Sequence, residues 1–187
     1  KNDLNEALKN YDKAIKLNPN YYEAIYNKAN IFLKLKDFSN ALKYYDKALS
    51  LKNDYVSAYE GKARVYKKIE KFNEAIKSWQ EIINLSPQNE NAHVQKGHLL
   101  FDKDILKDAL NCYEKAYQIN PNIPFLLGSI VYTKARMCEW NGLDKIIEDL
   151  KLKIEKDIKV SSPYTTLTIF DDPLAHLNIS KIWAKEN

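Results

Sequence analysis

Few side chains in this 187-residue sequence are arranged as a catalytic site would require. Cys138 is the first candidate, because a thiol near a cation can act as a nucleophile once its pKa is lowered. Arg136 lies two residues before it, but no histidine that could act as a base lies within ten residues on either side. We therefore interpret Cys138 as a small apolar side chain that packs in the core.

The three histidines do not predict a metal site. His93 and His98 are five residues apart, so on a helix they point in different directions and miss the i, i+4 geometry of a helical metal pair. His98 and Asp102 are one helical turn apart and could share a proton, although a solvated pair is the simpler interpretation. The sequence thus predicts no catalytic residue, no metal and no cofactor in this chain.

Composition narrows the class of protein further. Four Gly and six Pro are too few for a strand-and-turn protein, so nearly all of the chain should be helical. The 29 basic and 25 acidic residues are mixed without a run of like charges, which argues against a nucleic-acid partner. The longest weakly polar stretch, residues 118–133, is too short to span a bilayer. Two cysteines without a close-spaced motif, and no recognisable signal peptide, favour the cytoplasm.

A period of 34 residues organises most of the sequence. The register repeats a small residue, an aromatic residue four places later and a proline that closes the unit: Ala7, Ala41, Ala75 and Ala109; Tyr11, Tyr45, Trp79 and Tyr113; Pro19, Pro87 and Pro121, with Asn53 at the remaining proline position. The small residue lets two helices approach, the aromatic ring fills the space beside it, and proline makes the chain turn.

This register resembles the tetratricopeptide repeat, a pair of antiparallel helices in every 34 residues. The resemblance implies an all-α fold, an α-solenoid that winds into a right-handed superhelix. The predicted helices are 3–17, 21–35, 38–51, 55–69, 72–85, 89–102, 105–119 and 123–138. Residues 1–138 would form a half repeat followed by about three and a half repeats, and residues 139–187 a helical cap. The initial half repeat leads us to expect that the chain is a piece of a longer protein.

The resemblance also implies that the first helix of each unit forms a concave wall that binds extended peptides. The candidate peptide-binding residues are Tyr26, Asn27, Asn30 and Lys34, then Glu60, Arg64 and Lys68, then Gln95 and His98. The clamp that holds a terminal carboxylate in some family members is absent, because its positions hold Tyr26, Asn30, Gly61, Asn91 and Gln95. We therefore do not expect a carboxylate-gripping domain.

The wall is more similar to the asparagine ladder of O-GlcNAc transferase, whose amides grip a peptide backbone whatever its side chains. The ladder positions here hold Asn27, Gly61, Gln95 and Ser129, so one Asn and one Gln remain. Backbone gripping would be weakened, and the alternative is that these residues are simply solvated.

The repeat stops at "KARMCEWNGLDKI", residues 134–146, where no second helix of the expected pattern follows. Asn141-Gly142 predicts a turn, and the apolar spacing after it predicts one amphipathic helix of about 16 residues across 143–158. The stretch "SSPYTTLTIFDDP" is predicted to be non-helical. Asp172-Pro173 should start a last helix, whose inward residues would be Leu174, Leu177, Ile179, Ile182 and Trp183.

This end of the chain resembles the segment that leads from the repeats into the catalytic domains of the O-GlcNAc transferase and SPINDLY glycosyltransferases. The matching features, in order, are Gly128, Cys138-Glu139-Trp140, Ser162-Pro163-Tyr164, Leu167 and Asp171-Asp172-Pro173, with Glu139 in place of Asp and Tyr164 in place of Phe. Trp140 is predicted to be a large side chain that closes the last repeat. No catalytic domain is present in this chain, which should transfer no sugar, while the parent protein would use a UDP- or GDP-sugar.

Three functional hypotheses follow. The chain could be the acceptor-recruiting part of such a protein O-glycosyltransferase, binding proteins or extended peptides. It could instead be a free-standing adaptor with the same groove. Self-association through the convex face is the third, on the expectation that Tyr21, Tyr22 and Tyr44 are exposed.

Overall fold

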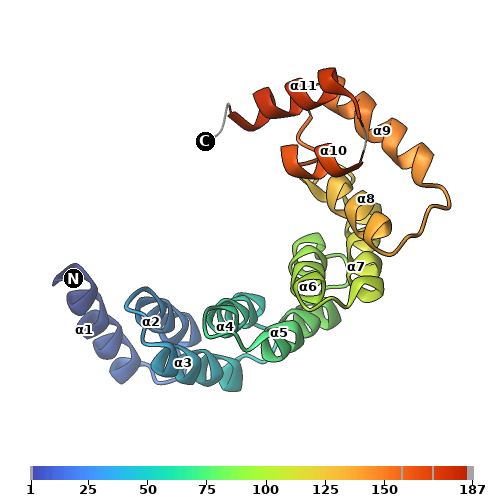
Figure 1. Ribbon diagram of the computed structural model, residues 1–187. Helices are drawn as coiled ribbons and strands as arrows, with labels where there is room; N and C mark the ends of the chain where they lie inside the picture. Colours follow the sequence, from blue (N-terminus) through green and yellow to red (C-terminus); the bar gives the residue numbers. More distant parts are fainter. Residues whose placement is uncertain (1, 157, 170, 185–187) are drawn as a thin grey trace. The chain divides into compact units, whose positions relative to one another are not determined.

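The computed structural model describes residues 2–156, 158–169 and 171–184, and all regular structure in these ranges is helical. The first eight helices are α1 (Asn2–Leu17), α2 (Tyr22–Lys34), α3 (Phe38–Leu51), α4 (Val56–Lys68), α5 (Phe72–Leu85), α6 (Glu90–Asp102), α7 (Leu106–Ile119) and α8 (Leu126–Arg136), as Figure 1 shows. The predicted all-α repeat is confirmed. The largest error in the helix ends is at α8, which begins three residues after the predicted start.

The small residues of the repeat are buried between paired helices, as the 34-residue register predicts. Helices α2 and α3, α4 and α5, and α6 and α7 form the three hairpins. Ala29 and Ala41 have no exposed surface in the first hairpin, and Ala63 and Ala75 are equally buried in the second. Because these positions carry only a methyl group, the two helices of a hairpin can pack closely.

The chain divides into two compact units, residues 1–87 with α1 to α5 and residues 88–187 with the remaining helices. Each unit is described by itself below. The division predicted after residue 138 separates the repeats from the non-repeat cap on sequence grounds, and it stays a prediction.

A left-handed residue follows the first helix of each of the three hairpins and also follows α8, and it recurs with the period of the repeat. These residues are Lys36, Glu70, Asp104 and Cys138, with φ of 62°, 58°, 60° and 54°. A residue of this kind ends a helix, and all four side chains are exposed. Cys138 is accordingly exposed, so its predicted place in the core is wrong. The three polar residues at the equivalent positions carried that signal in the sequence.

Trp140 does not close the last repeat, because 64% of its surface is exposed. The next helix, α9 (Leu143–Glu155), begins three residues later than Trp140. Leu143 is therefore the first apolar side chain to reach the core, and it is only 3% exposed. Because the turn at Asn141-Gly142 separates Trp140 from the start of α9, the Trp140 side chain stays outside the core. Its predicted core packing is therefore wrong.

The cap contains a helix that the sequence did not predict, α10 (Pro163–Ile169). Pro163 suits the first helical position, and the Ser162 hydroxyl accepts a hydrogen bond from the Thr165 amide at 3.2 Å. The hydroxyl of Thr166 also donates to the carbonyl of Pro163 at 2.8 Å, which supports a short turn despite poor helix propensity. Phe170, in the same predicted stretch, lies outside the described residues.

The other cap predictions are partly correct. Helix α9 ends at Glu155, so Ile158 lies beyond it. Helix α11 (Pro173–Ala184) begins at the predicted proline, and the Asp172 carboxylate accepts a hydrogen bond from the Ala175 amide at 3.0 Å. This bond lowers the pKa of Asp172. Only one face of α11 is buried, through Ala175, Ile179 and Ile182; Leu174, Leu177 and Trp183, which were predicted to face inward, are exposed.

Gly128 allows the cap to lie directly against α8. The Gly128 amide donates to the carbonyl of Val160 at 2.7 Å, and the Phe125 amide donates to that of Lys159 at the same distance. A Cβ on Gly128 would lie 2.8 Å from the Cα of Ser161. Helix α10 packs on α8 as well, beside it in Figure 1. The absence of a side chain at residue 128 is therefore what lets residues 159–161 pair with α8.

Candidate functional site

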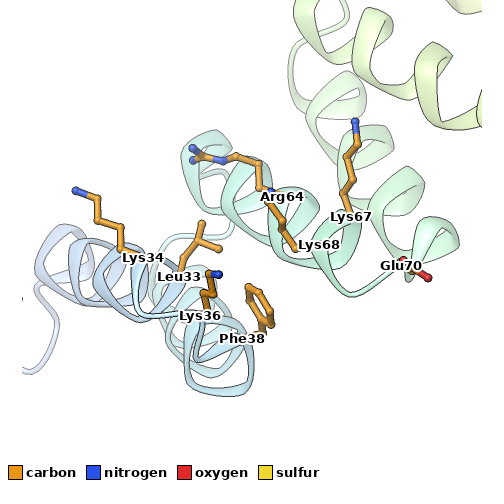
Figure 2. A pocket seen from close by; sticks show the side chains of 8 residues that line it. All are labelled: Leu33, Lys34, Lys36, Phe38, Arg64, Lys67, Lys68 and Glu70. Carbon is orange, nitrogen blue, oxygen red and sulfur yellow. The ribbon is translucent and has the colours of Figure 1, made fainter. Parts of the chain in front are cut away.

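In the first unit, the wall formed by α2 and α4 carries a groove. One part of it is lined by Tyr11, Tyr26, Asn27, Asn30, Ile31, Leu33, Lys34 and Arg64. The other part is lined by Leu33, Lys34, Lys36, Phe38, Arg64, Lys67, Lys68 and Glu70 (Figure 2). The two parts share Leu33, Lys34 and Arg64, and together we name them the α2–α4 groove. The second part has a volume of about 760 Å³, a size at which pockets bind ligands.

Six of the seven residues predicted for the wall of this unit line the α2–α4 groove. They are Tyr26, Asn27, Asn30, Lys34, Arg64 and Lys68. Glu60 is half-buried on α4 and is not among the lining residues. That these residues bind peptide stays a prediction.

The sequence prediction missed Ile31, Leu33 and Lys67 on the first helices, and it missed every groove residue that lies elsewhere. Lys36 and Glu70 belong to the left-handed turns, and Phe38 is the first residue of α3. Their recurrence at equivalent places in the 34-residue register was visible, but only a folded hairpin shows that a turn borders the groove.

A buried tyrosine occupies part of the hydrogen-bonding capacity of the wall. The Tyr45 hydroxyl donates to Oδ1 of Asn30 at 2.6 Å, and the tyrosine has no exposed surface. Asn30 therefore keeps its amide NH₂ for a ligand, whereas Asn27 has no such contact from Tyr45. Burial raises the pKa of Tyr45 to about 12, although the positive charge of Arg64 acts in the opposite direction.

We expect Tyr45 to make the first unit less stable at high pH. Its pKa rises from 10.0 in the unfolded chain to about 12 in the folded one, so the stabilisation is complete below pH 10 and is lost as the pH passes through about 12. The loss attributable to this one group is about 2 to 3 kcal/mol. Urea unfolding followed by circular dichroism from pH 9 to 12 measures it. Tyr45→Phe should show a shallower decline, and identical pH dependence for the two proteins would contradict the assignment.

The gap in the amide ladder at Gly61 has a packing cause. A Cβ at this position would lie 2.8 Å from the Tyr45 hydroxyl oxygen and still closer to Cε1 and Cζ of the same ring. Any side chain at residue 61 therefore competes with the buried ring that bonds Asn30. The missing ladder residue leaves room for Tyr45.

Two other lysines on α2 and α4 have a structural role. Lys28 pairs with Asp12 on α1 and donates to the Tyr44 hydroxyl at 2.9 Å. One period later, Lys62 pairs with Asp46 on α3 at 2.7 Å. Each pair joins the second helix of one repeat to the first helix of the next repeat, so these charges are neutralised within the fold.

In the second unit, the predicted residues Gln95 and His98 lie on α6. His98 Nδ1 is 2.9 Å from the hydroxyl of Tyr113, and burial raises the pKa of this tyrosine. His98 and Tyr113 line a small cavity, together with Tyr132 of α8 and Thr165 of α10. Gln95 is not among its lining residues, and its amide donates to Asn91 Oδ1 at 3.5 Å. The cap thus borders the wall at this end of the chain.

The aromatic residues suggested for self-association differ in exposure. Tyr21 is 44% exposed. Tyr22 and Tyr44 are half-buried, because Tyr22 packs edge-on against Tyr55 and Tyr44 stacks on Phe32, with ring centroids 5.1 and 5.3 Å apart. Their expected exposure is wrong.

The part of the chain that the structure describes contains no group of three or more His, Cys, Asp or Glu side chains that could hold a metal ion. In the same residues, no helix has the length and apolar character needed to cross a membrane.

Cys112 is buried, which raises the pKa of its thiol.

Sequence models of the tetratricopeptide repeat match residues 1–36, 22–55, 56–89 and 90–123. No curated protein matches the sequence. Among solved structures, a crystal structure of MamA is similar with a TM-score of 0.71 at 21% identity, covering 83% of this chain and 91% of that one. A structure described as "MamA 41-end from Desulfovibrio magneticus RS-1" has a TM-score of 0.68 at 18% identity, covering 82% of this chain and 86% of its own. At these identities the likeness concerns the fold.

Proposed function

Because this chain belongs to the tetratricopeptide repeat family, we propose that it is a protein-interaction scaffold that binds an extended polypeptide in the α2–α4 groove. The observation that carries the proposal is the groove itself, where amide side chains line one part, cations and Phe38 line the other, and Leu33, Lys34 and Arg64 line both.

The chemistry of the groove suits a polypeptide. The Asn27 amide can both donate to and accept from a peptide backbone, and Asn30 can donate through its free NH₂. Leu33 and Phe38 provide apolar surface for a side chain of the bound segment. An extended peptide exposes backbone groups and side chains together, so it can use both kinds of contact.

Replacing Asn27 and Arg64 together by Ala should weaken peptide capture about tenfold or more, since each substitution removes a hydrogen-bonding group worth about 1 kcal/mol. Binding to an array of diverse capped peptides measures this. The control replaces Asn111 and Lys43, which are exposed and do not line the groove, by Ala. Equal capture by both variants and the parent would refute the groove assignment.

We further propose that the chain is the acceptor-recruiting part of a protein glycosyltransferase resembling O-GlcNAc transferase and SPINDLY, whose parent protein would use a UDP- or GDP-sugar in the cytoplasm. Support comes from the junction residues Gly128, Pro163, Asp172 and Pro173, which have defined roles in the cap. Exposed Cys138 and Trp140 add no support. The cap also exposes Tyr164, Leu167, Leu174 and Leu177, apolar surface against which a catalytic domain would pack.

A free-standing adaptor is the second candidate. The observation that favours it is that the fold is similar to that of MamA, one structure of which is matched over 91% of the crystallised chain. Reading the coding sequence beyond Asn187 distinguishes the two. Continuation for about 300 to 400 residues into two nucleotide-sugar-binding domains would support the glycosyltransferase, and a nearby stop codon would support the adaptor.

A further inference from the structure

We infer that the α2–α4 groove selects a polypeptide segment rich in acidic side chains; the inference rests on the proposed peptide-binding function. The part of the groove shown in Figure 2 is lined by five cations, Lys34, Lys36, Arg64, Lys67 and Lys68, and by a single carboxylate, Glu70. The whole chain, by contrast, carries 29 basic and 25 acidic residues. Positive charge is therefore concentrated at this cavity.

These cations are available to a ligand. Within the described residues, none of the five forms an ion pair, whereas Lys28 and Lys62 on the same two helices are paired with Asp12 and Asp46. The fold thus neutralises the lysines that join neighbouring repeats and leaves the groove cations uncompensated. Uncompensated charge around a concave surface attracts an oppositely charged partner.

Helix capping explains only some of this charge. Lys34, Lys67 and Lys68 lie in the last turns of α2 and α4, where a cation offsets the negative end of the helix dipole. Arg64 lies a turn earlier, and Lys36 lies beyond the end of α2. Moreover, α6 ends without a basic residue, so the repeat does not require one.

The repeat that begins at α6 is acidic at two positions where the groove is basic. Asp102 stands one period after Lys68, and Asp104 stands two periods after Lys36. Asp104 is already paired with Arg136 at 2.8 Å. The basic character is therefore specific to the α2–α4 groove.

The arrangement favours a peptide over a nucleic acid. Figure 2 shows Leu33 and Phe38 between the α2–α3 hairpin and α4, with Lys34, Arg64 and Lys67 extending to one side of them. Successive side chains of an extended peptide point in opposite directions, so acidic residues could meet the cations while apolar residues meet Leu33 and Phe38. A phosphate backbone would make no use of the two apolar side chains.

The test is an array of diverse peptides of about ten residues, which extend to about 33 Å, each capped at both ends so that no terminal charge contributes. Purified chain should be retained most on peptides rich in Asp and Glu, and retention should fall as salt rises. Retention without preference for acidic peptides would overturn the inference while leaving the proposed function intact. No retention on any peptide would overturn both.

Variants that remove positive charge test whether the α2–α4 groove is the cavity that binds the acidic peptide. Lys34→Gln, Arg64→Gln and Lys68→Gln together should weaken binding of the best acidic peptide about tenfold, because three charge contacts are lost. The matched control, Lys43→Gln, Lys47→Gln and Lys77→Gln, removes the same charge from exposed positions on α3 and α5 and should bind normally. Equal weakening in both variants, or tighter binding of a single-stranded oligonucleotide than of any acidic peptide, would overturn the inference.

Discussion

Gly128→Ala should lower the free energy of unfolding by about 2 to 3 kcal/mol. The new methyl group would lie 2.8 Å from the Cα of Ser161, which is buried and belongs to the backbone segment that pairs with α8. That segment cannot move away without loss of the two 2.7 Å hydrogen bonds from Phe125 and Gly128. Helix propensity alone predicts the opposite sign, because Ala is the better helix former by about 0.5 to 1 kcal/mol.

Urea unfolding followed by circular dichroism measures the loss, and hydrogen exchange locates it. Exchange should accelerate first in α9 and α10, which pack on α8 beside residues 159–161, and in α11, which packs on α9 and α10. Ser129→Ala is the matched control, since it alters the adjacent residue and removes only a hydroxyl that bonds the Phe125 carbonyl at 3.1 Å. If both variants unfold within about 0.5 kcal/mol of the parent, the close contact between Gly128 and Ser161 is wrong.

Gly61→Ala is expected to destabilise the first unit by about 2 kcal/mol, again against helix propensity. The added Cβ meets the ring of Tyr45, which has no exposed surface and is held by its hydrogen bond to Asn30. A fully buried ring cannot rotate away without disturbing its neighbours. Gly61→Asn, which would complete the amide ladder by sequence, should therefore be at least as destabilising and should not improve peptide binding.

A double-mutant cycle tests whether the Tyr45 ring causes the loss of stability in Gly61→Ala. Tyr45→Leu removes the ring and is itself destabilising, but Gly61→Ala introduced into that background should cost much less than in the parent. The coupling free energy should be about 1 to 2 kcal/mol. Strictly additive effects would show that the ring does not limit residue 61.

The repeat could be predicted because its determinants are local and periodic. A small residue, an aromatic residue and a proline recur every 34 residues, and each acts within one hairpin or between neighbouring hairpins, so the ends of α1 to α7 follow closely from the register. The wall positions on α2 and α4 follow for the same reason, since helical spacing fixes which side chains share a face. Six groove residues could thus be predicted without coordinates.

The errors arise where the period ends. Cys138 and Trp140 looked like core residues because both types are often buried. In the structure, Cys138 lies in a left-handed turn and Trp140 in the connection before Leu143. Helix α10 was missed because three threonines and a proline are poor helix formers, while the capping hydroxyl of Ser162 and the packing on α8 stabilise it.

The all-helical repeat, its hairpins and the identity of most wall residues follow from the amino-acid sequence, because they depend on contacts at short, regular separation. Three features became apparent only in the folded chain: turn residues such as Lys36 join α4 in one basic groove, Tyr45 takes the space of a ladder amide, and residues 159–161 lie on α8. Those features depend on which surfaces meet once the helices have packed, and no local pattern of residue types specifies that.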